Sequence, residues 1–212
     1  MKHLLVIFDL DGTLVDSERL CCQAFIDLIP KLSVSVEGLM LAYQGQKLAD
    51  ILADLENKFG FSLPMDFESR YRQRVDALFE NELKAIDGVN EMLRRVPFPY
   101  CIASSGPPKK IKKALEVTGL GHFFEERIFS SYSINSWKPA PLLFLHAAKS
   151  MGYDPADCVV IEDSSVGIEA AIAAKMQWLI YDPLHRTTLS PRFQDMRDLP
   201  DRLYQLVASK PS

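Results

Sequence analysis

The chain has 212 residues, of which 48% are hydrophobic, so it can bury a sizeable core in one large domain or in one domain that carries a smaller insert. The formal net charge of -4, without a block of basic residues, argues against a nucleic-acid partner, and the lack of an apolar run of roughly 18 residues argues against a membrane span. The spacing of the four cysteines is typical of neither a disulfide framework nor a zinc site; they are Cys21, Cys22, Cys101 and Cys158. The apolar start LLVIF is too short for a secretion signal. We therefore expect a reducing, cytoplasmic location.

Apolar strand patterns alternate with helical patterns along most of the chain. The stretch HLLVIFD (3–9) predicts a buried strand, and so do YCIAS (100–104), ERIFS (126–130), DCVVIE (157–162) and MQWLIY (176–181). Helical patterns lie between them in PKKIKKALEVTG (108–119), PLLFLHAAKSMG (141–152) and SSVGIEAAIAAK (164–175). Continuous apolar strands joined by helices predict an α/β fold with a Rossmann-like parallel sheet that is covered on both faces.

One segment of about 80 residues, 16–95, has helical periodicity and no convincing strand. A βαβ crossover needs only about 30 residues, so this segment predicts an inserted all-helical cap subdomain. Pro97 and Pro99 mark the return to the sheet. We therefore predict a core made of residues 1–15 and 96–212, with a helical cap at 16–95.

Polar residues end three of the predicted strands. Asp9 and Asp11 follow the first strand, Ser104 ends the second, and Glu162 and Asp163 end the strand CVVIE. Ligands of doubly wound sheets bind beyond the carboxyl ends of the strands. Two carboxylates about 4 Å apart repel each other by roughly 4 kcal/mol at an effective dielectric constant of about 20, so such a group needs protons or a cation, and Mg²⁺ fits oxygen ligands beside a phosphate. Alternatively, each acid caps the helix that follows it.

Four motifs in this order resemble the haloacid dehalogenase-like phosphohydrolases. They are DLDGTLVD, Ser104 in CIASSG, Lys138 in SWKPAP, and VVIEDSSVG. The helical segment after the first motif is similar to the first type of cap in that family. The gap of 34 residues from Ser104 to Lys138 is too short for the family's other large cap.

The resemblance implies phosphoryl transfer through a covalent aspartyl phosphate. Asp9 would be the nucleophile and Asp11 the general acid and base. Lys138 would orient Asp9 and offset the negative charge. The resemblance further implies that Mg²⁺ is held by Asp9, the Asp11 carbonyl oxygen and Asp163, with Glu162 beside or on the ion, and that the phosphoryl group is bound by Ser104, Ser105 and Gly106.

The cap segment YQGQKLADIL is similar to the family's specificity loop, which places Gly45 and Lys47 at the substrate. Arg72 is a second candidate, ahead of Arg70 and Arg74. GQKLADI, YRQRVDALFENELKAIDG and SYSINSWKPAP resemble the 6-phosphogluconate phosphatase branch of the family, close to its β-phosphoglucomutase-like members. The implied substrate is a small phosphorylated metabolite, a sugar or sugar-acid phosphate, with 6-phosphogluconate as one candidate. The alternative is that Lys47 is a solvated surface residue.

Two other functions stay open. A sugar phosphomutase of the β-phosphoglucomutase type places a histidine twelve residues after the nucleophile, where this chain has Cys21. A phosphate-binding module without turnover would not need Asp11. A receiver domain is too short for the cap, no cysteine has an arginine six residues later, and no G-x-S-x-G elbow is present. We expect a monomer or a weak homo-oligomer.

Overall fold

A parallel sheet forms the centre of the computed structural model, which describes residues 4–209. Within that range the strand order is β3-β2-β1-β4-β5-β6. The strands are β1 (Leu5–Phe8), β2 (Tyr100–Ser104), β3 (Ile128–Ser130), β4 (Cys158–Glu162), β5 (Gln177–Tyr181) and β6 (Arg192–Phe193). All neighbouring strands pair in parallel, and the order reverses between β1 and β4. The predicted α/β fold is confirmed, although His3, at the start of the first predicted strand, lies outside the described residues.

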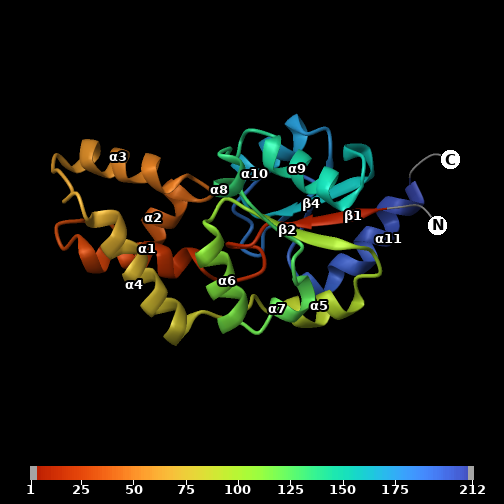
Figure 1. Cartoon of the computed structure of the whole chain (residues 1–212), viewed down its shortest axis with the longest axis horizontal. Coiled ribbons are helices and arrows are strands. Elements are labelled where there is room, and N and C mark those ends of the chain that lie inside the picture. Colours follow the sequence, from red (N-terminus) through yellow and green to blue (C-terminus); the bar gives the residue numbers. More distant parts are fainter. Residues whose placement is uncertain (1–3, 210–212) are drawn as a thin grey trace.

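Both faces of the sheet are buried because apolar side chains alternate between two clusters. Val6 and Phe8 of β1 belong to one cluster, and Leu5 and Ile7 belong to the other. One face is covered by α9 (Leu142–Met151) and α10 (Ser165–Ala173), and the opposite face by α5 (Val89–Arg95), α6 (Pro108–Val117), α7 (Gly121–Phe124) and α11 (Leu199–Ser209), as Figure 1 shows. The fully apolar strands of the sequence therefore form the buried centre of a three-layer core.

Several elements of the core were not predicted. They are α7, α8 (Ser131–Ile134), α11, the 3-10 turns η1 (Pro155–Asp157) and η2 (Met196–Asp198), and the two-residue edge strand β6. In β6, Arg192 is exposed and Phe193 is buried, which is too short a pattern to distinguish from a loop.

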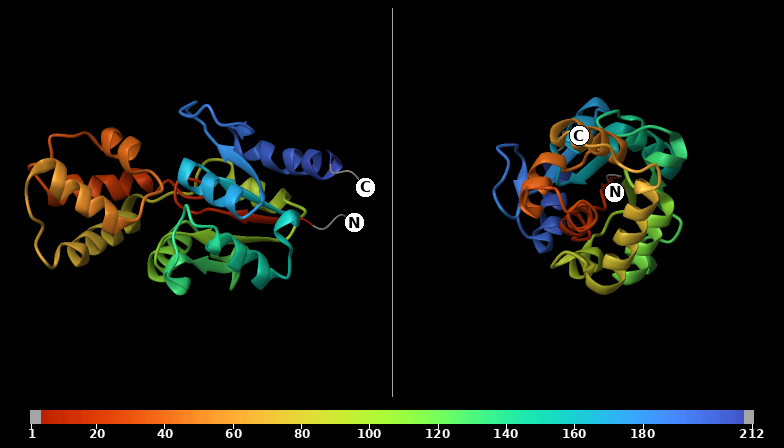
Figure 2. Two further views of the ribbon diagram at one scale, coloured as in Figure 1. Left: turned by 90° about the horizontal axis from the view of Figure 1, so that it is seen from above. Right: turned by 90° about the vertical axis from the view of Figure 1, so that its left-hand side faces the viewer.

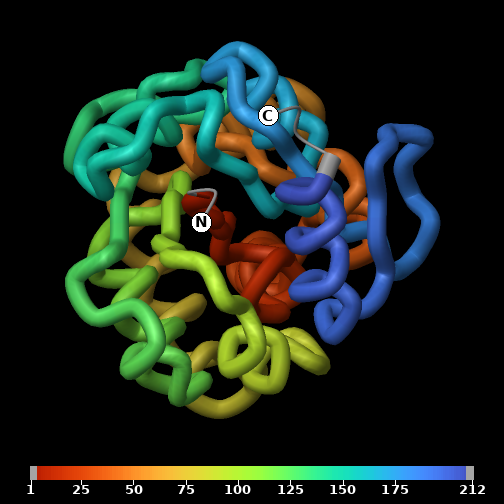
Figure 3. Tube along the Cα trace, turned by 90° about the vertical axis from the view of Figure 1, so that its right-hand side faces the viewer, coloured from red at the N-terminus to blue at the C-terminus, as the bar shows by residue number. Residues whose placement is uncertain are grey.

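The remaining helices form a separate layer beyond the carboxyl ends of the strands (Figures 1 and 2). They are α1 (Glu18–Leu28), α2 (Val36–Tyr43), α3 (Leu48–Phe59) and α4 (Phe67–Glu82), referred to here as the cap. The start of β1 and the end of α11 lie at the opposite end of the molecule, which faces the viewer in Figure 3.

Two chain segments that run side by side join the cap to the sheet. The Asp16 amide donates to the Lys84 carbonyl, and the Ile86 amide donates to the Leu14 carbonyl, both at 3.0 Å. Helix α5 falls inside the segment 16–95 but packs against η2 and α11. We propose that the cap begins and ends at this paired crossing. No helix within residues 4–209 has the length and apolar character that a membrane crossing requires.

Candidate active site

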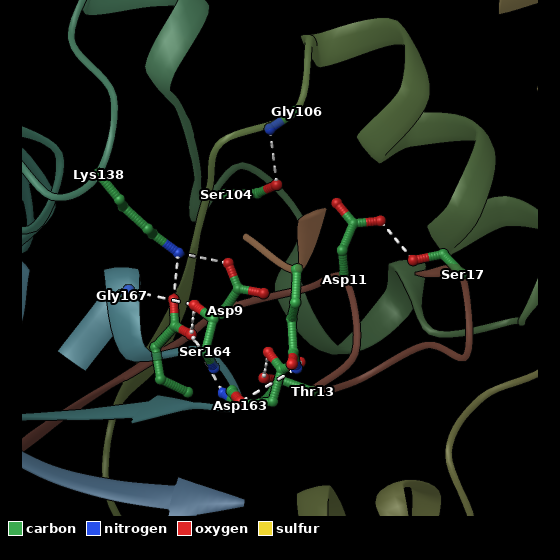
Figure 4. A network of polar contacts seen from close by, with 12 residues as sticks. Asp9, Asp11, Thr13, Ser17, Ser104, Gly106, Lys138, Asp163, Ser164 and Gly167 are labelled. Atoms are coloured by element: carbon green, nitrogen blue, oxygen red, sulfur yellow. Dashed lines mark hydrogen bonds and ion pairs between the residues drawn. The ribbon is translucent and has the colours of Figure 1, made fainter. Parts of the chain in front are cut away.

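The polar residues at the strand ends lie together (Figure 4), at the edge of the sheet that faces the cap (Figure 1). Phe8 of β1 is in register with Ile102 of β2 and Ile161 of β4, so the three strands end at one edge. Asp9 follows β1, Ser104 ends β2, and Glu162 ends β4. The structure thus brings Asp9 close to residues that are more than 90 positions away in the chain, at the point where the strand order reverses.

Lys138 bridges two of the acids from the loop that follows α8. Its Nζ donates to Asp9 Oδ1 and to Glu162 Oε1, both at 2.5 Å, and its side chain is only 3% exposed. Burial alone would lower the pKa of Lys138, but the charges of Asp9 and Glu162 outweigh it and raise that pKa. The ammonium therefore stays charged and fixes one oxygen of Asp9.

Glu162 is held on both of its oxygens. Besides the Lys138 contact, its Oε2 accepts hydrogen bonds from the Asp163 amide (3.0 Å), the Ser164 amide (3.0 Å) and Ser164 Oγ (2.8 Å). Gly167 in the first turn of α10 makes room for this carboxylate, since a Cβ there would lie 1.9 Å from Glu162 Cδ. Glu162 is thereby fixed at the N-terminus of a helix, where a negative charge is favoured.

Replacing Gly167 by alanine is expected to push Glu162 out of this position and to disturb Lys138 with it. Losing a partner that orients the reacting groups lowers activity by about 10- to 100-fold in comparable sites. Steady-state kinetics on p-nitrophenyl phosphate measures the effect. Gly121→Ala is the matched control, because the nearest atom to its added Cβ is 3.9 Å away. Equal activity of the two variants would contradict this role for Gly167.

Asp11 lies on the other side of Asp9 and is held by Lys110, a residue that was not predicted. Lys110 Nζ of α6 lies 2.6 Å from Asp11 Oδ1, and Ser17 Oγ donates to the same oxygen. Burial would raise the pKa of Asp11, but Lys110 and Ser17 outweigh it and lower that pKa. The Asp11 carboxylate is therefore ionised in the structure, with Oδ1 occupied by two donors.

The carboxylate of Asp163 receives one hydrogen bond from the core and one from the cap. Thr13 Oγ1 donates to its Oδ1 at 3.1 Å, and Gln44 Nε2 donates to its Oδ2 at 2.7 Å. Burial, together with the charges of Glu18 and Glu162, raises the pKa of Asp163 well above its usual range. Burial and the nearby acids likewise raise the pKa of Glu18 to about 8. Acids outnumber cations here, so the site favours an additional positive charge.

The donor set fits a hard divalent cation. One carboxylate oxygen each from Asp9, Glu162 and Asp163 lies within 4.8 Å of the others. An all-oxygen set with excess negative charge is typical of Mg²⁺ and Ca²⁺ rather than of metals that prefer sulfur or nitrogen ligands. Glu162 already accepts four hydrogen bonds, so Asp9 and Asp163 are the acids whose oxygens have acceptor positions to spare.

Ser104, Ser105 and Gly106 lie next to this group of acids, and Ser105 and Gly106 line the cavity above Asp9. Ser104 Oγ accepts from the Gly106 amide at 3.0 Å. Ser105 Oγ is buried and has no hydrogen-bond partner among the described residues, although it lines the cavity above Asp9. A buried hydroxyl without a partner is costly, and an oxyanion in the cavity would satisfy it.

Two cationic side chains of the cap, Lys47 and Arg72, line the same cavity and contact aromatic residues of the core. Lys47 Nζ lies 4.0 Å from the centre of the Trp137 ring, and Arg72 donates to Tyr132 Oη at 3.0 Å. Arg72 is also paired with Glu68 of its own helix, and Arg74, which does not line the cavity, is paired with Asp27. Of the predicted cationic residues, Lys47 and Arg72 thus lie in the wall of the cavity that contains Asp9.

Comparison with known proteins gives consistent matches along the chain. A sequence model described as haloacid dehalogenase-like hydrolase matches residues 4–175. The 6-phosphogluconate phosphatase of Escherichia coli strain K12 is 33% identical over 204 residues, which cover 92% of each chain. Hexitol phosphatase B of the same strain is 28% identical over 198 residues, which cover 90% of this chain and 88% of the relative. A crystal structure of a conserved haloacid dehalogenase-like protein of unknown function from Agrobacterium tumefaciens strain C58 has a TM-score of 0.85 and 30% identity, and the match covers 97% of this chain and 99% of that one.

Proposed function

The chain belongs to the haloacid dehalogenase-like hydrolase family, and from that premise we propose that it is a Mg²⁺-dependent phosphatase whose nucleophile is Asp9. The motif resemblance is confirmed by the family match, and the relatives that are named as phosphatases support the reaction class. The observation that carries the proposal is the position of Asp9. One of its oxygens is fixed by Lys138 while the carboxylate lies beside Glu162 and Asp163 at the floor of a cavity.

In the first step the free oxygen of Asp9 attacks phosphorus and the bond to the leaving oxygen breaks. Lys138 holds Asp9 in one orientation and offsets the charge that gathers around it. The hydroxyls of Ser104 and Ser105 donate to the phosphoryl oxygens, and the amide of Gly106 orients the Ser104 hydroxyl by donating to its Oγ. When bound, Mg²⁺ would neutralise charge between Asp9 and the phosphate, with Asp9, Asp163 and the Asp11 carbonyl oxygen as its ligands and Glu162 holding the loop beside it.

Asp11 serves both proton transfers. Lys110 and Ser17 occupy its Oδ1, which leaves Oδ2 to exchange a proton with the reacting oxygen. The ionised form accepts a proton from the water that hydrolyses the aspartyl phosphate. Before that, the arrival of a phosphate dianion beside Asp11 favours the protonated form, which donates to the leaving group.

The proposed substrate is a phosphorylated sugar or sugar acid, with 6-phosphogluconate as the leading candidate. Lys47 and Arg72 place positive charge in the cavity wall on the cap side, and Arg72 shares its charge with Glu68. A carboxylate at the end of the substrate opposite its phosphate would match that charge. The names of two similar phosphatases, for 6-phosphogluconate and for hexitol phosphates, support this substrate class.

A phosphomutase activity is disfavoured by Cys21. This residue lines the cavity where a mutase would need an imidazole, and burial raises the pKa of its thiol above the usual value. A protonated thiol is a poor proton carrier near neutral pH. Cys21, Cys22 and Cys101 form no disulfide within the described residues, which supports the proposed reducing, cytoplasmic location.

The proposal is tested by phosphate release from a panel of sugar phosphates, sugar-acid phosphates and polyol phosphates, with Mg²⁺ and with EDTA. We expect turnover with Mg²⁺, its loss in EDTA and its recovery when Mg²⁺ is added back. Equal rates with and without EDTA would contradict a metal-dependent phosphatase. Conversion of a hexose 1-phosphate into its 6-phosphate, followed by phosphorus NMR, would instead establish a mutase.

Replacing Lys47 by alanine is expected to lower kcat/KM for 6-phosphogluconate by about 1.5–3 kcal/mol, the range for a hydrogen bond to a charged group. Activity on p-nitrophenyl phosphate, which has no acidic tail, should change little. Lys58→Ala is the control, since Lys58 lies in α3, the helix that begins directly after Lys47, but is exposed and paired with Asp54. Equal losses on both substrates would show that Lys47 supports the cap or the phosphate rather than the acidic tail.

A further inference from the structure

The loop between α2 and α3 lies directly on the loop that follows β4. Gln44 Nε2 donates to Asp163 Oδ2 at 2.7 Å and to the Asp163 carbonyl oxygen at 3.1 Å. At the next residue, Gly45, the backbone has a φ of +73°, and a Cβ would lie 2.8 Å from Ser164 Oγ. A glycine is needed at this position to let the cap backbone approach the core so closely.

Asp163 is therefore oriented from two sides, by the core and by the cap, and these two parts are joined only through the two chain segments that run side by side between them. Thr13, which holds Oδ1, belongs to the core loop after β1, whereas Gln44, which holds Oδ2, belongs to the cap. If the cap moves away from the sheet, Asp163 keeps Thr13 and loses both contacts with Gln44. Each carboxylate oxygen has two acceptor positions, so Gln44 and a cation can share Asp163.

We propose that Gln44 is a positioning residue that couples closure of the cap to metal binding at Asp163. The inference rests on the proposed Mg²⁺-dependent phosphatase and adds to it a residue that acts through Asp163 without touching the phosphate. With the cap closed, the Gln44 amide holds Asp163 in its metal-binding orientation. Because such coupling is reciprocal, a ligand that favours closure tightens Mg²⁺ binding, and Mg²⁺ favours closure.

The test compares Gln44→Ala with Gln46→Ala, a matched change two residues away. Gln46 Nε2 donates to the Ala42 carbonyl oxygen within the cap, so its loss leaves Asp163 untouched. Isothermal titration calorimetry gives the Kd for Mg²⁺ with and without saturating inorganic phosphate. Circular dichroism and thermal unfolding show whether each variant is folded.

For the wild type and Gln46→Ala we expect phosphate to tighten Mg²⁺ binding. For Gln44→Ala we expect the Kd for Mg²⁺ in the presence of phosphate to rise by about 10- to 100-fold, the loss typical of residues that orient a metal ligand, and the effect of phosphate to shrink. In kinetics, Gln44→Ala should need more Mg²⁺ for half-maximal rate on p-nitrophenyl phosphate, with kcat largely recovered at saturating Mg²⁺.

Failure of the proposal for Gln44 can be distinguished from failure of the proposed function. A wild type that hydrolyses phosphate esters and binds Mg²⁺, together with a Gln44→Ala variant of unchanged Mg²⁺ affinity and unchanged phosphate effect, would overturn the role of Gln44 alone. A folded Gln44→Ala variant with lower kcat and unchanged Mg²⁺ affinity would also overturn it. A wild type that neither binds Mg²⁺ nor needs it for turnover would overturn the proposed function itself.

Discussion

Asp9→Asn is expected to retain less than about one per cent of the wild-type kcat on every ester that the protein hydrolyses, because an amide cannot form the acyl phosphate on which the covalent route depends. The fold should be kept, since an amide oxygen can still accept the hydrogen bond from Lys138. Burial and the neighbouring acids raise the pKa of Asp9 well above its ordinary value, while Lys138 opposes them. Removing this charge should therefore leave the thermal stability unchanged or raise it.

Asp182→Asn is the control for this change. Asp182 is also a buried aspartate directly after a strand, but it accepts hydrogen bonds from the amides of Arg186 and Thr187 at a different part of the sheet edge. Its asparagine variant should keep its turnover. Mass spectrometry checks that the introduced asparagine has not been deamidated to aspartate. If it has not, activity of Asp9→Asn above about one per cent of wild type would exclude Asp9 as the nucleophile.

Lys138→Met is expected to lower both stability and turnover. The substitution leaves Asp9 and Glu162, which are 9% and 1% exposed in their side chains, without their shared cation. Removing one partner of a buried ion pair costs about 3–5 kcal/mol. Losing a preorganised charge at the reacting group lowers kcat by about 10²- to 10³-fold. Urea unfolding without Mg²⁺ gives the free energy of unfolding, and steady-state kinetics with Mg²⁺ gives kcat.

Lys113→Met provides the comparison at the surface. Lys113 also lies 2.5 Å from a carboxylate, but its partner Glu80 is 59% exposed, so the pair is screened by water. Its loss should cost no more than about 1 kcal/mol and should not affect kcat. If the two lysine variants had the same stability and the same kcat, the bridge that Lys138 makes between Asp9 and Glu162 would be irrelevant to the mechanism.

The sheet and its motif residues were predictable because their signals are local. Strands such as YCIAS are apolar throughout, since both faces are buried, and the polar residue after each strand marks the edge where ligands bind. Asp9, Ser104, Lys138 and Asp163 also match a family pattern in chain order. The parallel topology then brings them to one edge without further information.

Lys110 and Gln44 were missed because their surroundings depend on long-range packing, whereas Glu18 was missed although a local signal was present. Lys110 sits in the run KKIKK, which reads as a solvated helix face, yet α6 brings it to Asp11, which is 99 positions away. Gln44 reaches Asp163 across 119 positions and only through the docking of the cap. Glu18, next to Ser17 at the start of α1, could have been found from its place directly after the first motif.

The stereochemical course at phosphorus tests the covalent route most directly. The substrate is a thiophosphate ester made chiral with oxygen isotopes, hydrolysed in isotopically labelled water with Mg²⁺. Attack by Asp9 and then by water are two in-line displacements, each of which inverts the configuration, so the account predicts overall retention in the released thiophosphate. Overall inversion would show a single displacement by water and would contradict an aspartyl-phosphate intermediate.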